Sequence, residues 1–491
     1  MNPPSTAPSR SQLDKAFVGG LAWTAGSKWV TQLVTWLSVF ISARLLSPSD
    51  FGTMEMAAYV ATFASLLAEF GIGTAVLQMH ELDSRILAQL NTISVVFYTI
   101  MLGFAASIAP LVATFFRSEQ ITLPIIVYSL GFAFTAFQAV PQGLLQREMD
   151  YRRLSLAEAT QAIVQAVVTV AGAFSGMGYW ALVAGQMAGR AAATVLVVFW
   201  KPVPFALPRW KQVSAPMRFG FSVAVDRLAW TAYSLADGVI VGRILGQSPL
   251  GVYRLAMNLA SAPAEKISML LMRVTGPLLA KVQHDHSAMK RYFLFISDAL
   301  ALSIFPLVFG LAAIAPEAIT VTVGRKWAGA IVPLQWLAVF MAFRTLNSLM
   351  GQVLTSLRRA AYLMWVSLFT AIVMTVSFLV AARWGISAVA AAWIVMSPVT
   401  MLPPAIKLFR LIQCGLREYL AILSPPAVAS AVMLCAVFGL KRWLLPVGLP
   451  PLWSLVAQVT AGAAVYMGVL LSVYRPVVMR YVQFVQHLRD N

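Results

Sequence analysis

The sequence has few charged residues and almost no cysteine. Of its 491 residues, 11% are charged and 59% are hydrophobic, and the mean hydropathy is +0.78. An ordinary soluble domain carries about a quarter charged residues, so the composition excludes that class. The two cysteines, Cys414 and Cys435, are too few for a disulfide framework or a thiolate metal site.

Several motifs of enzymes are also missing. The chain has no Walker A glycine loop and no Asp-x-Asp pair, so it lacks the usual signs of ATP hydrolysis and of metal-dependent sugar transfer. His284, Asp285 and His286 lie in one short loop without a further ligand nearby, and we expect a solvated turn there. The sequence therefore predicts a protein that is not an enzyme and holds no metal.

Long apolar runs dominate the chain. They are continuous and about 20 residues long or longer, which is typical of transmembrane helices, whereas barrel strands are shorter and alternate. We predict an all-α polytopic membrane protein with fourteen transmembrane helices. The predicted segments are 17–45, 51–77, 88–112, 122–145, 154–175, 179–200, 217–245, 250–275, 291–315, 329–355, 362–382, 387–410, 419–440 and 452–473.

The basic residues indicate the orientation. Most Lys and Arg residues of the predicted loops lie on the side of the N-terminus, and the positive-inside rule then places both termini in the cytoplasm. The net charge of +18 is spread between apolar segments and forms no basic domain, so no nucleic acid is expected as a partner. The loops on the outer side are short, and no external domain is predicted.

The two halves of the chain resemble each other. A shift of 199 positions places Ala43-Arg44-Leu45-Leu46 on Gly242-Arg243-Ile244-Leu245 and Gly52 on Gly251. A stretch that contains prolines lies between the two halves. Since proline interrupts a helix, we expect this stretch to be a linker. The predicted organisation is a six-helix lobe at 1–200, a cytoplasmic linker at 201–216, a second six-helix lobe at 217–410, and helices 13 and 14 with a cytoplasmic tail at 411–491.

Residues 217–275 carry many ionisable side chains for a membrane segment. Such side chains persist there only where water or a partner compensates them, or where they serve a function. Each costs about 2.5–3.5 kcal/mol at the bilayer centre. Residues 11 apart share a helix face, so Asp226 falls with Asp237 and Arg254 with Glu265. We expect these faces to point into the protein, where Asp226 and Glu265 either serve transport or form ion pairs that fix helix packing.

Unpaired cations in other predicted helices extend this group. Lys28 coincides with Arg227 under the repeat, and Arg190 is another buried cation without an adjacent acid. A surplus of positive charge in a cavity favours an anionic substrate such as a phosphate. The predicted substrate-binding cations are Lys28, Arg227, Arg254 and Arg344. The predicted residues for charge balance or proton coupling are Glu69, Asp226, Asp237 and Glu265.

Five stretches carry a resemblance to a known family. They are LLSPSDFGTMEMA at 45–57, EFGIGTAVLQ at 69–78, REMDYRRLS at 147–155, ADGVIVGRILGQSPLGVYRLAMNLASAPAEKI at 236–267 and GRKWAGAIVPLQWLA at 324–338. With them the chain resembles the oligosaccharide and exopolysaccharide flippases of the multidrug/oligosaccharidyl-lipid/polysaccharide exporter superfamily, in particular the colanic-acid-type branch.

The resemblance implies two pseudo-symmetric six-helix lobes around a central cavity, with alternating access. The implied cargo is a polyprenyl-diphosphate-linked oligosaccharide repeat unit, moved from the inner to the outer leaflet of a bacterial inner membrane for exopolysaccharide biosynthesis. No cofactor is expected, and a proton or sodium ion is the candidate for coupling. Membrane lipid, the polysaccharide polymerase and the export machinery are the other expected partners.

Two alternative functions would require features that can be compared with the sequence. A multidrug or cation exporter of the same superfamily would line its cavity with net acid, whereas the predicted cavity is cationic. A membrane polysaccharide polymerase or ligase would be expected to carry a long outer loop with catalytic residues, and the sequence has none.

Overall fold

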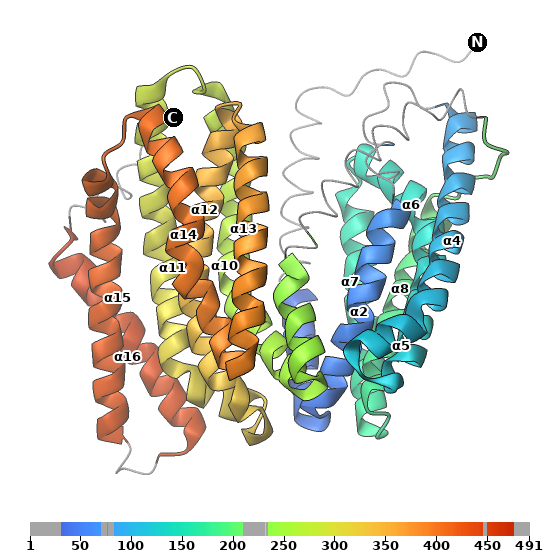
Figure 1. Ribbon diagram of the computed structural model, residues 1–491, viewed down its shortest axis with the longest axis horizontal. Helices are drawn as coiled ribbons and strands as arrows, with labels where there is room; N and C mark the ends of the chain where they lie inside the picture. Colours follow the sequence, from blue (N-terminus) through green and yellow to red (C-terminus); the bar gives the residue numbers. More distant parts are fainter. Residues whose placement is uncertain are drawn as a thin grey trace. The chain divides into compact units, whose positions relative to one another are not determined.

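The computed structural model describes residues 31–69, 76, 83–209, 231, 234–444 and 449–475. Every regular element in these ranges is an α-helix or a short 3-10 helix, which confirms the all-α prediction (Figure 1). Ten described helices are long and apolar enough to cross a membrane. The class of a multi-pass membrane protein is therefore confirmed, and the count of fourteen helices stays a prediction.

The chain forms two compact units, Met1–Gly251 and Val252–Asn491. The first unit contains helical residues 31–45 and 234–245 and the named elements that follow. These are α2 (Pro48–Glu69), α4 (Ser84–Phe116), η1 (Glu119–Ile121), α5 (Thr122–Ser129), α6 (Gly131–Arg147), α7 (Tyr151–Phe174), α8 (Tyr179–Trp200) and the first turn of α10 (Gln247–Lys281).

The segment predicted over 122–145 lies within one candidate membrane span, Glu119–Arg147, but its helix is interrupted once. A turn at Leu130 separates α5 from α6, and α6 begins at Gly131. Glycine weakens a helix interior, and a Cβ at this position would lie 2.7 Å from Nη1 of Arg190. The missing side chain therefore makes room for a charged group from α8.

The second unit contains the rest of α10 and six further α-helices. These are α11 (His286–Thr322), α12 (Ile331–Ser356), α13 (Ala360–Ala381), α14 (Ile386–Ile412), α15 (Leu416–Leu444) and α16 (Pro451–Ser472), with 3-10 turns η2 (Arg325–Ala330) and η3 (Ala382–Trp384). Asp285 caps α11 by accepting hydrogen bonds from the backbone N–H groups of Ser287 and Ala288. His284 and His286 beside it are exposed, as expected for a solvated turn.

Ion pairs join α11 to α15 at both ends. Nζ of Lys290 lies 2.7 Å from a carboxylate oxygen of Glu418, and Nζ of Lys441 lies 2.7 Å from one of Glu317. Since residue numbers rise together in the two pairs, the helices run parallel. The helices predicted as an appended pair are thus packed on α11 inside the second unit, and the predicted lobe boundaries remain predictions.

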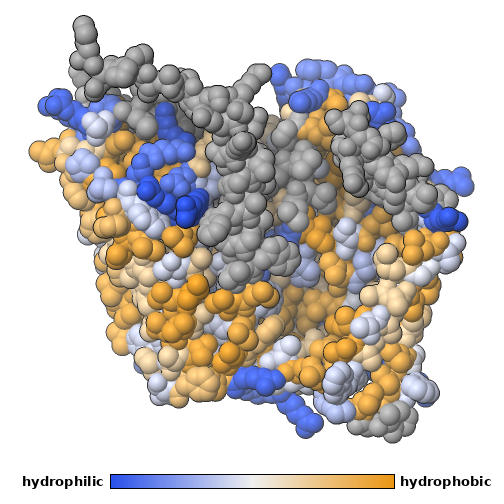
Figure 2. Space-filling view, turned by 180° about the vertical axis from the view of Figure 1, so that it is seen from behind, coloured by the Kyte–Doolittle hydropathy of each residue, from blue (hydrophilic) through white to orange (hydrophobic). Residues whose placement is uncertain are grey.

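Large apolar side chains stay exposed on the flanks of both units. Val195 and Phe199 of α8 are 67% and 78% exposed, and Trp365 of α13 is 64% exposed. In the space-filling view, hydrophobic residues cover the helix flanks and hydrophilic residues gather toward the helix ends (Figure 2). This distribution suits helices whose outer faces contact lipid.

Candidate functional site

The predicted site residues divide between described and undescribed parts of the chain. Lys28, Asp226 and Arg227 lie outside the described residues, and so does the side chain of Glu69 at the end of α2. Their predicted roles therefore remain predictions.

The other four predicted residues differ in burial. Asp237 is 1% exposed, and its Oδ1 accepts a 2.7 Å hydrogen bond from the backbone N–H of Gly238. Arg254 of α10 is half-buried and engaged with other groups of the protein. Glu265 and Arg344 are exposed. Arg254 and Glu265, predicted to share an inward face, thus differ in their surroundings.

A described cluster of polar side chains lies where α8 packs on α5 and α6. Arg190 of α8 donates through Nη2 to the hydroxyl of Tyr128 at 3.2 Å, and Gln186 donates to the same hydroxyl at 3.3 Å. The guanidinium carbon of Arg190 also lies 4.9 Å from the centre of the Tyr128 ring, a cation–π contact. Tyr128 therefore holds the arginine in place, and Gln186 bonds to the same hydroxyl.

The cluster continues along α8 and α6. Thr194, one turn beyond Arg190, donates to Oε1 of Gln138 at 3.1 Å, and Gln138 donates to Oε1 of Gln142 at 3.1 Å. The two sets of contacts follow each other along α8, and we name their six side chains together the polar seam. Its members are Tyr128, Gln138, Gln142, Gln186, Arg190 and Thr194.

Glycines set the packing on another face of α8. A Cβ on Gly189 would lie 2.7 Å from the backbone oxygen of Gln161 on α7, and one on Gly185 would meet the side chain of Thr169. Helices approach closely where such small residues line the contact. Glycines thus bring α7 against α8, and the polar residues that alternate with them occupy the side toward α5 and α6.

The seam carries a net positive charge. Within the described part of the chain, Arg190 forms no ion pair. Glu55 of α2 acts electrostatically on Tyr128, but no ion pair joins it to the arginine. A guanidinium without a carboxylate partner is available for an anion.

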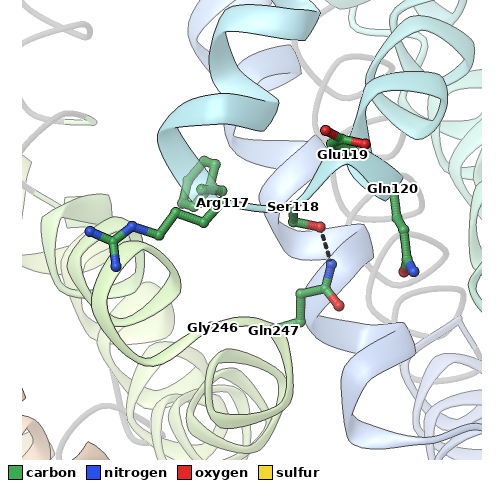
Figure 3. Close-up of a pocket in the computed structure, with 7 residues that line it drawn as sticks. Arg117, Ser118, Glu119, Gln120, Gly246 and Gln247 are labelled. Carbon is green, nitrogen blue, oxygen red and sulfur yellow. Dashed lines mark hydrogen bonds between the residues drawn. The ribbon is translucent and has the colours of Figure 1, made fainter.

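A second polar feature is a pocket of about 520 Å³ at one end of the first unit. Its lining comes from the turn after α4 and the turn before α10. Gln247 donates a short hydrogen bond to the hydroxyl of Ser118 across it, and Arg117 points to the side opposite Glu119 and Gln120 (Figure 3). Outside this lining, Arg243 places its guanidinium 5.3 Å from the ring centre of Phe115.

Arg190 stands out in the sequence as a buried cation, whereas its partners do not. Gln186, Arg190 and Thr194 recur every four residues in an otherwise apolar helix, a signal that could have marked the seam. Another missed residue is Asp298 of α11, which is 3% exposed and is a lone acid in the run FLFISDALALSIF.

Curated proteins of bacterial polysaccharide biosynthesis are similar over 70% to 95% of the chain. The teichuronic acid biosynthesis protein TuaB of Bacillus subtilis is 24% identical over 94% of this chain and 96% of its own length. The succinoglycan biosynthesis transport protein ExoT of Rhizobium meliloti is 26% identical over 95% of each chain. The lipopolysaccharide biosynthesis protein WzxC of Escherichia coli is 23% identical over 70% of each chain.

Solved structures show the same fold. The lipid II flippase MurJ in an inward closed conformation superimposes with a TM-score of 0.72 over 93% of this chain and 99% of its own, at 11% identity. An inward-facing multidrug resistance transporter of the MATE family gives a TM-score of 0.60 over 78% of this chain and 96% of its own, at 15% identity. The chain therefore has the fold that these two structures share.

A family model described as polysaccharide biosynthesis protein matches residues 41–332. This match covers more than half of the chain and includes most of the stretches that carried the resemblance. The predicted kinship with polysaccharide flippases is confirmed, and the chain belongs to the polysaccharide biosynthesis protein family.

Proposed function

We propose that the protein is a flippase for a polyprenyl-diphosphate-linked oligosaccharide repeat unit. The main support combines two findings. The chain matches a family of polysaccharide biosynthesis proteins, and 93% of it superimposes on a lipid II flippase. A relative named as a transport protein for succinoglycan biosynthesis covers 95% of the chain. The repeat unit would move from the inner to the outer leaflet of a bacterial inner membrane.

The architecture that we propose has fourteen transmembrane helices in two six-helix lobes, 1–200 and 217–410, joined by the linker 201–216 and followed by helices 13 and 14 within 411–491. Each of the fourteen predicted segments contains described helical residues, which supports this count. Both termini would be cytoplasmic, in line with the excess of Lys and Arg on that side.

The proposed mechanism is alternating access to a cationic cavity. Lys28, Arg227, Arg254 and Arg344 would bind the diphosphate, since charge-assisted hydrogen bonds to phosphate are strong. Glu69, Asp226, Asp237 and Glu265 would balance charge or carry a coupling proton, with sodium as the other candidate ion. The polymerase and the export machinery would take over the flipped unit.

Deletion and restoration of the gene test the function. Without the protein, lipid-linked repeat units should accumulate in the inner leaflet, where only inside-out vesicles expose their sugars to an added lectin. The intact chain should restore exposure on the outer side. Arg254→Ala, at equal protein level, should restore it less than the intact chain does. Normal outer-leaflet delivery in the deletion strain would contradict the proposal.

A further inference from the structure

The polar seam lies at the middle depth of its helices. Arg190 stands midway between Tyr179 and Trp200, the ends of α8, so at 1.5 Å per residue it is about 16 Å from either end. A bilayer core is about 30 Å thick. A charged side chain at this depth faces protein or a water-filled space and not hydrocarbon.

The lipid-facing side of α8 points away from Arg190. The most exposed apolar residues of the helix, Val195 and Phe199, lie about 140° and 180° around the axis from it. Arg190, Gln142 and Gln186 are nevertheless only half-buried. Each of these side chains therefore keeps an exposed part, and that of Arg190 lies on the side of α8 away from Val195 and Phe199.

The seam has hydrogen-bonding capacity that the described part of the chain leaves unused. A guanidinium carries five N–H donors, and Arg190 uses one, toward Tyr128. Gln186 donates to that hydroxyl but accepts nothing through Oε1, and Gln142 accepts through Oε1 but donates nothing. The guanidinium of Arg190 and the amide groups of Gln186 and Gln142 can thus form further hydrogen bonds with a ligand.

This pattern suits a saccharide that carries a single anionic group, because one guanidinium stands among neutral amide groups. Amide donors and acceptors spaced along two helices match the alternating hydroxyls of a saccharide, and a planar guanidinium binds one carboxylate through paired hydrogen bonds. We infer that the polar seam binds the oligosaccharide part of the cargo and that Arg190 binds a carboxylate on it. This inference rests on the proposed function and assigns it a substrate class, a lipid-linked acidic oligosaccharide.

The test compares three lipids with the full chain in nanodiscs. The first is polyprenyl diphosphate carrying a glucuronate-containing oligosaccharide, the second carries the same glycan with its carboxyl reduced to an alcohol, and the third carries no sugar. Binding is measured for the intact chain, Arg190→Gln, Arg190→Lys and Gln142→Ala. The control is Arg383→Gln, since Arg383 is an exposed arginine in η3.

Arg190→Gln should weaken binding of the acidic lipid by about tenfold to a hundredfold, because a hydrogen bond to a charged group is lost. It should leave the reduced and sugar-free lipids within twofold. Gln142→Ala should weaken both glycan lipids alike, by about threefold to tenfold. Arg190→Lys keeps the charge and the fold but not the paired geometry, and it should fall between Arg190→Gln and the intact chain.

Other outcomes separate the inference from the function. Equal weakening of all three lipids by Arg190→Gln and Arg190→Lys would assign Arg190 to the diphosphate or to folding, and would overturn the inference. Flipping by the intact chain with no effect of Arg190→Lys or Gln142→Ala on binding would overturn it too, leaving the function in place. If the intact chain neither binds nor moves any of the lipids, the proposed function itself fails.

Discussion

Gly52 of α2 and Gly251 of α10 make the same contact, each with a backbone carbonyl of the other's helix. A Cβ on Gly52 would collide with the carbonyl oxygen of Gln247, and a Cβ on Gly251 would collide with that of Pro48. The shift of 199 that relates the glycines also relates Pro48 to Gln247. The internal repeat is thus expressed as a local two-fold contact inside the first unit.

Alanine at either glycine should destabilise the protein. The colliding atom is a backbone oxygen that no side-chain rotation can move, and overpacking of this kind costs about 1–3 kcal/mol. We expect Gly52→Ala and Gly251→Ala to lower the unfolding temperature in detergent and to reduce export. Gly103→Ala is the control, since nothing lies within 4 Å of its Cβ position. Equal unfolding temperatures for all three variants would refute the contact.

The segment 201–209 should detach from α4 when Asn91 is replaced. Nδ2 of Asn91 donates to the backbone oxygen of Val203 at 3.0 Å, and the backbone N–H of Arg209 donates to Oε1 of Gln89 at 2.8 Å. Both side chains are buried, so loss of one leaves a backbone group unsatisfied, at about 1–3 kcal/mol.

Asn91→Ala should therefore speed amide hydrogen exchange at 203–209 and expose this segment to protease. Gln120→Ala serves as the control, because Gln120 is exposed and remote from the segment in sequence. Unchanged exchange in Asn91→Ala would show that apolar contacts alone hold the segment.

The ion pair between Lys441 and Glu317 should respond unequally to loss of either partner. Side chains of both are mostly buried, at 25% and 15% exposure, and Oε2 of Glu317 is buried without a hydrogen bond in the described structure. Lys441→Met leaves a buried carboxylate without its cation, which is more costly than neutralising the acid.

We expect Lys441→Met to lower the unfolding free energy by about 1–3 kcal/mol and Glu317→Gln by less. The double variant should regain part of the loss, which a double-mutant cycle of unfolding measures. Strict additivity of the two effects would exclude a direct interaction.

The start of α11 should loosen in acid. The backbone N–H of Ala288, followed by the hydroxyl of Ser287, lowers the pKa of Asp285 by hydrogen bonding to its ionised form. Since the pKa is lowered on folding, the cap contributes stability above the unfolded-state pKa and loses it as the pH falls through the folded-state pKa.

Hydrogen exchange at Ala288, corrected for its intrinsic pH dependence, should accelerate over that range. Asp285→Asn should still cap α11, because asparagine caps helices about as well as aspartate does. Its exchange rate at Ala288 should not change over this pH range, because asparagine does not titrate. Asp285→Ala should exchange fast at every pH. The same pH response in Asp285→Asn would assign the effect to another group.

The sequence predicted the fold class and the kinship better than the site. Apolar runs of membrane length need no tertiary information, so the helices of the second unit were anticipated closely. The turn at Leu130 was not, because it depends on a side chain from α8 that enters beside Gly131. The repeat marked Gly52 and Gly251 as equivalent but could not show that each faces the other's backbone.

Site residues were harder because a polar residue on one helix does not reveal its partner on another. Arg190 was recognised as a buried cation, whereas Tyr128 is an ordinary residue until packing brings its hydroxyl to Arg190 and Gln186. Charges alone marked Glu265 and Arg344, both of which the structure leaves exposed. Counting ionisable groups thus selected residues by the free-energy cost of a charge in the bilayer, and not by the burial of the side chain in the folded protein.

The paired clamps between α11 and α15 have a mechanical consequence. Two parallel rods pinned near both ends can neither slide past each other nor tilt separately without breaking a pin. If α11 tilts during a transport cycle, α15 must then tilt with it through the same angle. α15 therefore belongs to whatever rigid body α11 moves with, although it is the next-to-last helix that the structure describes.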